Sequence, residues 1–487
     1  MSATALQSLK AQRTPAAIAK QTTVLGQVFT PPQVAEWMAR WVCTENPRTI
    51  LDPALGAGVF LHHVSRHIPT NSRPAFIAYE LDPRLVDSFR SPTHLDVTVR
   101  CQDFLRARIT QRFDAIIANP PYVRHHALNY DESTWKTLDR ESGVRLNRTT
   151  NLYGLFLVRI WSLLAPQGRA AIITPAEWLN ADFGGPIKAA LLRENAIEAI
   201  ICFDHQYRLF ADAMTTAAII LLRRGRKADA GIRLIKLRDA DELANFRIAD
   251  RKPHTTSLSP TSKWTPLIEA GAPLPDGPCL GEVARCLRGI ATGANNYFAL
   301  RPSEIHHWNI ARTEVRPCIT KAPQIRGDVL ETRLLKQLER ADERLFLLTP
   351  TKRPSPGLAR YLEQGKERGI HRRYLPAHRP IWYEPENRKP APLLISVFMR
   401  GPFRIVLNSA RALNLTAYHG IYPRTDDQQI VRALWKYLCS KEGQSALRRH
   451  ARIYADGLFK LEPRDVEAVS VPESLIAKFL KRSRRTR

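Results

Sequence analysis

Short apolar runs alternate with amphipathic stretches along the first half of the chain, and each run has the length of a single strand. The runs predicted to form strands are residues 49–52, 75–80, 97–101, 115–118, 168–175, 197–203 and 217–222. Helical spacing of apolar side chains is found in residues 34–42, 84–89 and 151–161. Strands that alternate with helices predict a parallel, right-handed α/β sheet, which we expect the last of these strands to close.

Polar side chains follow the first four predicted strands. Asp52, Glu80 and Asp103 stand at or just after the ends of the first three, and Asn119 follows the run that ends at Ala118. Because the carboxyl ends of parallel strands meet at one edge of a sheet, we expect a single ligand crevice there.

The fourth of these strand ends carries the motif Asn119-Pro120-Pro121-Tyr122. Two prolines in a row hold the backbone extended and cannot donate to a ladder, so the motif forms a stiff loop. That loop presents an amide, a proline carbonyl and an aromatic face. Asn-Pro and Pro-Pro are also common in ordinary turns, and only the upstream motifs favour a functional interpretation.

The turn after Asp52 contains Gly56 and Gly58, which allow the backbone to approach a ligand closely. Neither GxGxxG nor a P-loop lysine is present, and the carboxylate would repel a phosphate. The turn therefore suits a polar ligand that carries positive charge. Glu80 follows at the roughly twenty-residue spacing of an acid that binds ribose hydroxyls in Rossmann-like sheets.

Composition indicates an intracellular protein that meets a polyanion. The 487 residues allow two or three domains, and the formal net charge is +27. No apolar run reaches the length of a membrane span, and the first residues lack the pattern of a secretory signal. The seven cysteines are scattered without a CxxC pair, so we expect reduced thiols, no metal site and a cytoplasmic location.

The chain divides by composition near residue 250. We expect a flexible lead at residues 1–21, a first domain at 22–250 and a second domain at 251–487 that ends in a basic tail. The polar stretch 123–150 is expected to be a mobile loop beside the crevice. Thr30 is expected to cap a helix that starts at Pro31, with no further role indicated by that stretch alone.

Taken in order, these motifs resemble those of the γ-class adenine-N6 DNA methyltransferases of bacterial restriction–modification systems. The similarity covers roughly residues 22–222, with weaker echoes at 288–298 and 455–473. It implies a Rossmann-like, class I S-adenosylmethionine-dependent methyltransferase domain and a C-terminal α+β target-recognition domain. The methyl donor would be S-adenosylmethionine. Its implied contacts are Thr30, Asp52, Ala54, Gly56 and Gly58 for the methionine part, Glu80 for the ribose, and Asp103 and Phe104 for the adenine ring.

The resemblance also implies a catalytic loop made of Asn119, Pro120, Pro121 and Tyr122. The oxygen of the asparagine amide and the carbonyl of Pro120 would hold the amino group of an adenine that has flipped out of the duplex. Tyr122 and Phe210 would stack on that base. Core packing is the alternative for Phe210.

The second domain would read double-stranded DNA. Its candidate contacts are Arg288, Thr292, Asn295, Asn296, Arg372 and Arg373. We expect a monomer, and a separately encoded cognate endonuclease is a partner that the resemblance allows.

Two alternatives remain at this level. The same four-residue motif occurs in N-methyltransferases that act on RNA bases or on protein glutamine, because the nitrogen nucleophile poses the same chemical problem. A catalytically silent DNA-binding protein is the other alternative, against which the intact Asp52, Asn119 and Tyr122 argue.

Overall fold

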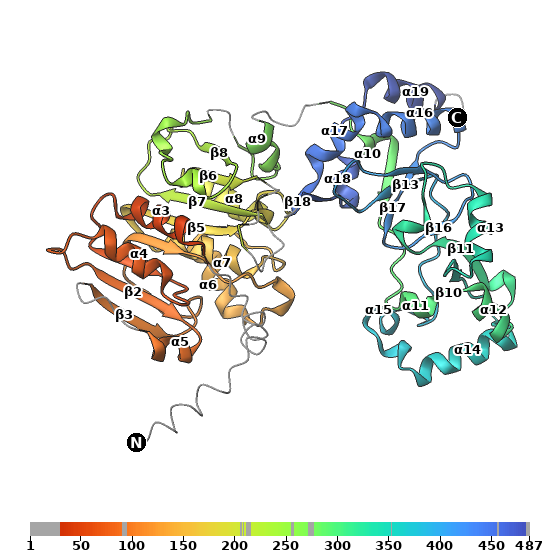
Figure 1. Cartoon of the computed structure of the whole chain (residues 1–487), viewed down its shortest axis with the longest axis horizontal. Coiled ribbons are helices and arrows are strands. Elements are labelled where there is room, and N and C mark those ends of the chain that lie inside the picture. Colours follow the sequence, from red (N-terminus) through yellow and green to blue (C-terminus); the bar gives the residue numbers. More distant parts are fainter. Residues whose placement is uncertain are drawn as a thin grey trace. The chain divides into compact units, whose positions relative to one another are not determined.

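The computed structural model describes residues 30–89, 95–204, 207, 209–210, 216–254, 258–270, 277–351, 353–454 and 457–483. The chain forms two compact units: unit 1 is Met1–Pro273 with Ile453–Gly457, and unit 2 is Leu274–Arg452 with Leu458–Arg487 (Figure 1). The expected lead at 1–21, the end of the basic tail, and most of the stretch around Phe210 lie outside the described residues.

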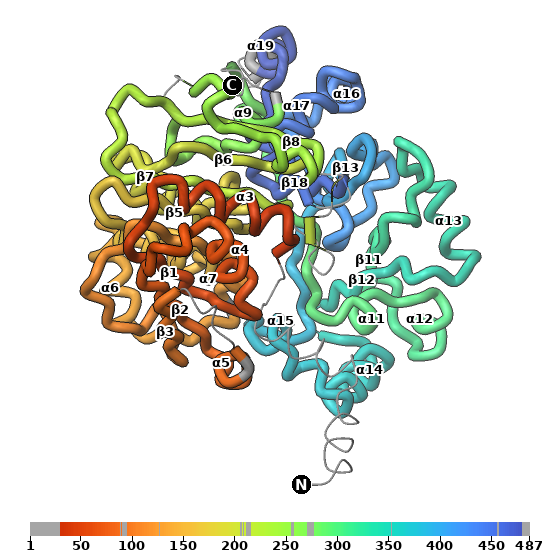
Figure 2. The backbone as a smooth tube through the Cα atoms, turned by 60° about the vertical axis from the view of Figure 1, so that its left-hand side comes forward, coloured from red at the N-terminus to blue at the C-terminus, as the bar shows by residue number. Residues whose placement is uncertain are grey.

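Unit 1 is built on an eight-stranded sheet with the order β3-β2-β1-β4-β5-β7-β6-β8. Its strands are β1 Thr49–Asp52, β2 Ala75–Glu80, β3 Asp96–Cys101, β4 Phe113–Ala118, β5 Leu164–Pro175, β6 Ile197–Phe203, β7 Ala217–Arg223 and β8 Arg233–Leu237. The strands of this sheet that are labelled in Figure 2 follow this order, from β3 at the lower edge to β8 at the upper edge. All pairs are parallel except those of β7, which runs antiparallel to β5 and β6. The predicted Rossmann-like, class I methyltransferase fold is confirmed.

The sheet does not end where the sequence pattern suggested. The expectation that residues 217–222 close the sheet is wrong, because β7 lies inside it and β8 forms the edge beyond β6. Every residue of β6 except Glu198 is buried, so this strand needs partners on both sides. β8 is only partly buried and lacks the continuous apolar run of the other strands, which is why its sequence gave little signal.

Helices cover both faces of the sheet (Figure 1). The helices of unit 1 are α3 Pro32–Cys43, α4 Val59–His67, α5 Pro83–Ser88, α6 Glu132–Ser142, α7 Leu152–Ser162, α8 Gly184–Arg193 and α9 Thr265–Ala270. Along β4, Ala115 and Ile117 pack in one apolar cluster with α3 and α4, whereas Ile116 and Ala118 pack in another with α7. This alternation follows from the two-residue period of a strand, and both faces of the sheet are therefore dry.

The expected loop at residues 123–150 contains a helix. Asp131 caps the start of α6, and its carboxylate accepts a hydrogen bond from the amide of Thr134 at 2.9 Å. Gly143 caps the other end in the left-handed conformation. Trp135 and Leu138 are buried against α7. The stretch is polar overall because only this narrow stripe of α6 faces the core, so the prediction of a mobile loop is wrong for this part.

Residues beyond 250 continue unit 1. Trp264 is fully buried and packs edge-to-face on Trp178, with ring centroids 6.1 Å apart. Its backbone amide donates to the carbonyl of Leu179 at 3.1 Å, and the ammonium of Lys188 lies 5.1 Å from its ring centroid. The division between the units follows Pro273 for this reason, later than the change in composition near 250.

Unit 2 has mixed α+β structure with short, mostly antiparallel strands. Its strands are β9 Ala284–Leu287, β10 Ala299–Leu300, β11 Val315–Ile319, β12 Phe346–Leu348, β13 Leu393–Ser396, β14 Phe398–Met399, β15 Ile405–Leu407, β16 Leu413–Asn414, β17 Tyr418–Pro423 and β19 Leu458–Lys460, with β18 Arg452–Tyr454 where the chain passes between the units. Its helices are α10 Leu280–Val283, α11 Asn295–Phe298, α12 Pro302–Trp308, α13 Thr332–Arg340, α14 Pro356–Glu367, α15 Tyr374–Ala377, α16 Gln428–Cys439, α17 Lys441–His450, α18 Pro463–Glu467 and α19 Glu473–Ser483. Two four-stranded sheets, β10-β12-β11-β16 and β15-β13-β17-β9, contribute to its two apolar clusters. Across the described residues, no helix is both long and apolar enough to span a bilayer.

We predict that Trp264→Ala destabilises unit 1 by about 3–5 kcal/mol, because the change removes a fully buried aromatic side chain and its contact with Trp178. Thermal unfolding followed by tryptophan fluorescence and circular dichroism would measure the effect. Lys252→Ala, at an exposed position in the same segment, is the control and should unfold like the wild type. Equal unfolding of the two variants would contradict the assignment of residues 258–270 to the core of unit 1.

Candidate functional site

A cavity of about 440 Å³ opens in unit 1 where β1, β2, β3 and β4 end. Eight of the residues proposed from the sequence line it: Thr30, Ala54, Gly56, Glu80, Asp103, Phe104, Asn119 and Pro121. A cavity is therefore present at the carboxyl edge of the sheet, where the crevice was expected. Asp52, Gly58, Pro120, Tyr122 and Phe210 do not line the cavity.

The turn after β1 is tied to the end of β2 through Glu80. One oxygen of its carboxylate accepts from the amide of Gly56 at 2.8 Å, and the other accepts from Leu81 and Asp82 at 2.8 and 2.9 Å. Gly56 and Gly58 have φ angles of +55° and +78°, a region that glycine adopts without strain. Glu80 thus holds two loops in register while it faces the cavity.

Asp52 lies behind the cavity wall and is fully buried. Its Oδ1 accepts from the amide of Ala54 at 3.0 Å, whereas its Oδ2 has no hydrogen-bond donor in the described part of the chain. Burial raises the pKa of this carboxyl to about 7, against the opposing effect of the Ala54 hydrogen bond, and the nearby charge of Glu80 adds to the rise. A cation near this carboxyl would favour its ionised form.

The lining of the cavity is acidic and aromatic. Among the described residues that line it, Glu80 and Asp103 are acidic and none is lysine, arginine or histidine. Tyr79, Phe104 and Phe156 supply aromatic surface, and Leu81, which also lines the cavity, is 59% exposed. This lining disfavours a phosphorylated ligand and suits an uncharged ring attached to a cationic group.

A buried arginine that sequence reasoning missed fixes the segment after β3. Arg159, in α7, donates to the carbonyls of Leu105 and Ala107, and its guanidinium lies 5.2 Å from the ring centroid of Phe104. Asp103 in turn accepts from the amide of Leu105 at 2.9 Å. The available signal was a single arginine within an otherwise apolar helical pattern.

Asn119 follows β4 and is oriented by Thr30. Its Nδ2 donates to the hydroxyl of Thr30 at 2.9 Å, so Oδ1 is the end of the amide group that faces away from Thr30. The expectation that Thr30 caps the helix is wrong, because Pro31 occupies the cap position of α3 and no side chain caps the first turn. Thr30 is instead a positioning residue for Asn119.

Aromatic rings surround Tyr122 beside the cavity. Its ring centroid lies 5.7 Å from that of Phe210 and 6.3 Å from that of Tyr153, both edge-to-face. Phe210 is 2% exposed and belongs to an apolar core cluster, so packing accounts for its position in this structure. The hydroxyl of Tyr122 is shielded without a hydrogen-bond partner among the described residues, and burial raises its pKa well above the usual value.

A second polar group missed from the sequence stands next to these rings. Glu177 follows β5, and its carboxylate accepts from Asn151 at 3.3 Å and from the hydroxyl of Tyr153 at 3.5 Å. It repeats the pattern of a polar side chain after a strand end that is found at β1 to β4. The carboxylate of Glu177 is therefore a polar group at the edge of the aromatic cluster around Tyr122.

In unit 2, a cavity of about 490 Å³ collects four of the six DNA-contact candidates: Thr292, Asn295, Asn296 and Arg373. Arg368 also lines it and was not singled out from the sequence. Arg288 and Arg372 are exposed but do not line this cavity. Thr292 is fully buried, so its side chain is not available to a large ligand. In neither unit do the described residues contain a group of side chains suited to a metal ion.

Comparison with known proteins identifies the family. The N-6 DNA Methylase model matches residues 16–253, and the model for the C-terminal domain of the type II methyltransferase M.Eco57I matches residues 273–485. The type II methyltransferase M.AccI of Acinetobacter calcoaceticus is 32% identical over 90% of this chain and 84% of its own length. The chain belongs to the N6-adenine DNA methyltransferase family.

A second relative supports this membership, and a solved structure shares the fold. The type II methyltransferase M.XamI of Xanthomonas campestris pv. amaranthicola is 27% identical over 92% of this methyltransferase and 85% of its own length. A structure of the type IIL restriction–modification enzyme MmeI in complex with DNA shares the fold, with a TM-score of 0.56 and 12% identity over 94% of this chain and 67% of that one. The protein is accordingly a DNA methyltransferase of the type II restriction–modification kind.

We predict that Asp52→Asn removes a pH-dependent loss of stability in the ligand-free methyltransferase. The folded-state pKa of about 7 lies above that of an unfolded aspartate, so stability from this group is present below about pH 4 and is lost as the pH rises through 7. Between these two pH values, the free energy of unfolding of the variant should therefore rise by about 4 kcal/mol relative to that of the wild type.

Denaturant unfolding of both proteins across that range would measure the difference. Asp229→Asn, at an exposed aspartate of unit 1, is the matched control and should leave the wild-type profile unchanged. Parallel profiles of wild type and Asp52→Asn would contradict the assignment of an elevated pKa to Asp52.

Proposed function

We propose that this methyltransferase transfers a methyl group from S-adenosylmethionine to the N6 amino group of adenine in double-stranded DNA, as the modification enzyme of a restriction–modification system. The observation that carries the proposal is the position of Asn119. It stands at the wall of an acidic cavity, with its amide oriented by Thr30 and the Tyr122 ring beside it.

The residues of the unit 1 cavity fit S-adenosylmethionine. The buried Oδ2 of Asp52, which lacks a donor among the described residues, suits the positively charged methionine part, together with the turn at Ala54, Gly56 and Gly58. Glu80 would accept the ribose hydroxyls, and Asp103 and Phe104 would contact the adenine ring. When bound, the donor supplies an electrophilic methyl group. No lysine, arginine or histidine among the described lining residues would oppose its charge.

The catalytic loop acts on the nucleophile. The amino group of adenine is a poor nucleophile because its lone pair is delocalised into the ring. Oδ1 of Asn119 and the carbonyl of Pro120 would each accept one amino hydrogen, which favours a pyramidal nitrogen with a directed lone pair. Pro121 keeps the loop stiff, so these acceptors are positioned in advance. Transfer is then a direct in-line displacement without a covalent enzyme intermediate.

A base within a duplex cannot reach this loop, so the target adenine must flip out of the helix. Tyr122 and Phe210 would stack on it. Their edge-to-face contact in this structure leaves no slot between parallel rings, so stacking would require at least one ring to turn. Glu177 and Tyr153 stand where they would contact the edge of such a base.

Unit 2 would recognise the DNA sequence. The net charge of +27 favours a polyanion, and release of counterions makes such binding depend strongly on salt. We infer that residues 22–250 and their continuation in unit 1 are catalytic and that unit 2 is the target-recognition domain. The enzyme would act as a cytoplasmic monomer, with a separately encoded endonuclease as its functional partner.

The test is expression in a host that lacks DNA methylation, followed by mapping of modified bases over the genome. We expect N6-methyladenine at one short sequence. Purified enzyme should label duplex DNA, whereas transfer RNA, ribosomal RNA and a release factor should remain unlabelled. Label in RNA or protein alone would replace this proposal with one of the two N-methyltransferase alternatives, and no label in any substrate would support a silent DNA-binding protein.

We predict that Asn119→Ala lowers kcat by about a hundredfold to a thousandfold and leaves the Kd for S-adenosylmethionine nearly unchanged. The change removes one acceptor of the amino hydrogens but none of the proposed donor contacts. Single-turnover methylation and calorimetric binding would measure the two effects. Asn71→Ala, at an exposed position of unit 1, is the control. Undiminished turnover of Asn119→Ala would refute the role of this amide.

We also predict that S-adenosylmethionine binds more weakly below pH 7. Because the cationic donor stabilises the ionised carboxyl of Asp52, whose pKa is about 7 without ligand, binding at lower pH must release a proton. The Kd should rise by about tenfold per pH unit below 7 and level off above it.

Calorimetry in buffers with different ionisation enthalpies would count the released protons. S-Adenosylhomocysteine, which lacks the sulfonium charge, should show a smaller pH dependence, and Asp52→Asn should show none in this range. Binding of the donor that is independent of pH would contradict the proposed electrostatic interaction between the donor and Asp52.

A further inference from the structure

We propose that the cavity of unit 2 is a base-reading site, in which Asn295 and Asn296 contact base edges of the target duplex while Arg368 and Arg373 contact its phosphates. The inference rests on the proposed function for the identity of its ligand as duplex DNA. Four features of the described residues support it. The loop at residues 291–299 is held at both ends, and the amide of Asn295 is oriented by a hydrogen bond. The side chains of Arg368 and Arg373 are exposed, and both line one cavity together with Asn295.

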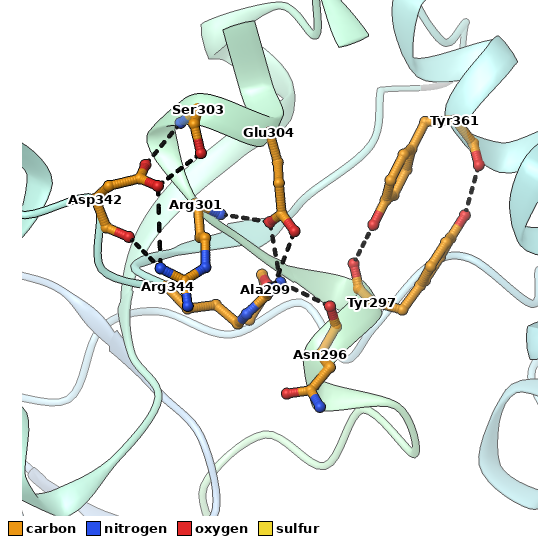
Figure 3. Close-up of polar contacts among 9 residues, drawn as sticks. All are labelled: Asn296, Tyr297, Ala299, Arg301, Ser303, Glu304, Asp342, Arg344 and Tyr361. Atoms are coloured by element: carbon orange, nitrogen blue, oxygen red, sulfur yellow. Dashed lines mark hydrogen bonds and ion pairs between the residues drawn. The ribbon is translucent and has the colours of Figure 1, made fainter. Parts of the chain in front are cut away.

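The loop in question runs from Ala291 to Ala299, and Arg344 fixes its C-terminal side (Figure 3). Its Nη1 donates to the carbonyls of Asn296 and Ala299 at 2.6 and 2.5 Å. Its guanidinium is paired with Glu304 at 2.9 and 3.0 Å, and Glu304 also accepts from the amide of Arg301 at 2.8 Å. The charge of Arg344 is therefore neutralised within unit 2 and is used to fix backbone carbonyls.

Tyr297, which follows Asn296 in the loop, is held in place by Tyr361. The hydroxyl of Tyr297 donates to the carbonyl of Tyr361 at 3.0 Å, and the hydroxyl of Tyr361 donates to the carbonyl of Tyr297 at 2.8 Å. Their rings stack with centroids 4.6 Å apart at an interplanar angle of 10°. Figure 3 shows this reciprocal pair beside Asn296. Both tyrosines are buried, so the loop is tied to α14 on this side.

The N-terminal side of the loop is held as firmly. Nη2 of Arg379 donates to the carbonyls of Ala291 and Thr292 at 2.8 and 2.9 Å. Gly293 has a φ angle of +77°, and a Cβ there would lie 2.8 Å from Cδ of Pro376, so the loop packs directly on α15. The backbone from Ala291 to Ala299 is thus fixed at both ends.

The Asn295 amide is oriented by a buried threonine. The hydroxyl of Thr292 accepts from the amide of Ala294 at 3.1 Å and donates to Oδ1 of Asn295 at 2.6 Å, a distance typical of an O–H···O bond. The Nδ2 group of Asn295 is then left on the other side as a donor. Thr292 acts through Asn295 and is a positioning residue, which accounts for its full burial.

The Asn296 side chain extends away from the Arg344 cluster in Figure 3, and it is exposed at the cavity. Among the described residues, the side chains of Arg368 and Arg373 are exposed and form no hydrogen bond or ion pair. Base readout needs amides in fixed positions, whereas phosphate contacts tolerate mobile cations. Asn295 can donate to N7 or O6 of a purine, and Asn296 can bind N6 and N7 of adenine through both ends of its amide.

The test is selection of bound duplexes from a random pool by the full-length protein, with methylation of the same duplexes measured separately. Asn296→Ala should lower discrimination at one base pair by about tenfold to a hundredfold, without changing the other positions. Thr292→Val should give a smaller loss of the same kind through Asn295, and Thr292→Ser should restore it. Asn387→Ala, exposed in unit 2 and outside the cavity lining, is the control.

Arg368→Gln and Arg373→Gln should keep the selected sequence and weaken binding to all duplexes. Each change should reduce the slope of log binding constant against log salt by about 1. Arg333→Gln, at an exposed arginine of α13, is the matched control for loss of one charge. Circular dichroism and thermal unfolding verify that each variant is folded.

An unchanged selected sequence with Asn295→Ala and Asn296→Ala would overturn the proposal, and so would a wild-type protein that selects no sequence. If the wild type selects a sequence that the asparagine variants relax, but no duplex is methylated, the base-reading site stands and the proposed function fails. Measuring DNA binding and methyl transfer separately therefore distinguishes a failure of the base-reading site from a failure of the proposed function.

Discussion

Two carboxylates at the ends of neighbouring parallel strands, in a site whose described lining contains no basic side chain, are the constraint on which unit 1 depends. Asp52 is fully buried and its pKa is raised by burial and by the charge of Glu80. The fold offsets part of this cost with the backbone amides of Ala54 and Gly56, which shape the turn between them. A ligand that brings a positive charge near Asp52 would offset the remaining unfavourable free energy. Asp52 therefore destabilises the ligand-free protein and suits a site for a cationic ligand.

Positioning of amides recurs in both units. In unit 1 the hydroxyl of Thr30 holds Nδ2 of Asn119, and in unit 2 the hydroxyl of Thr292 holds Oδ1 of Asn295. A buried or half-buried threonine costs little conformational entropy because its χ1 is restricted, so it is an effective support for a functional side chain. Each asparagine therefore presents one defined end of its amide.

Arginines have two distinct roles that composition cannot separate. Arg159, Arg344 and Arg379 donate to backbone carbonyls and stabilise loops from within. Arg368 and Arg373 remain exposed at a cavity and are suited to an anionic ligand. Some of the basic side chains that contribute to the net charge of +27 therefore bind backbone carbonyls within their own unit. Fewer basic side chains remain to contact a polyanion than the composition suggests.

The amino-acid sequence by itself determined the α/β class, seven of the eight strands of unit 1 and the crevice at their carboxyl ends, because apolar periodicity and strand-end side chains are local properties. It missed β8, whose edge position demands little hydrophobicity, and α6, whose buried stripe is narrow. Only the tertiary structure decided that Thr30 orients an amide, that Arg159 braces a loop and that Arg368 joins the cavity of unit 2. These contacts join residues far apart in the chain, and a local pattern carries no information about which distant partner a polar side chain will meet.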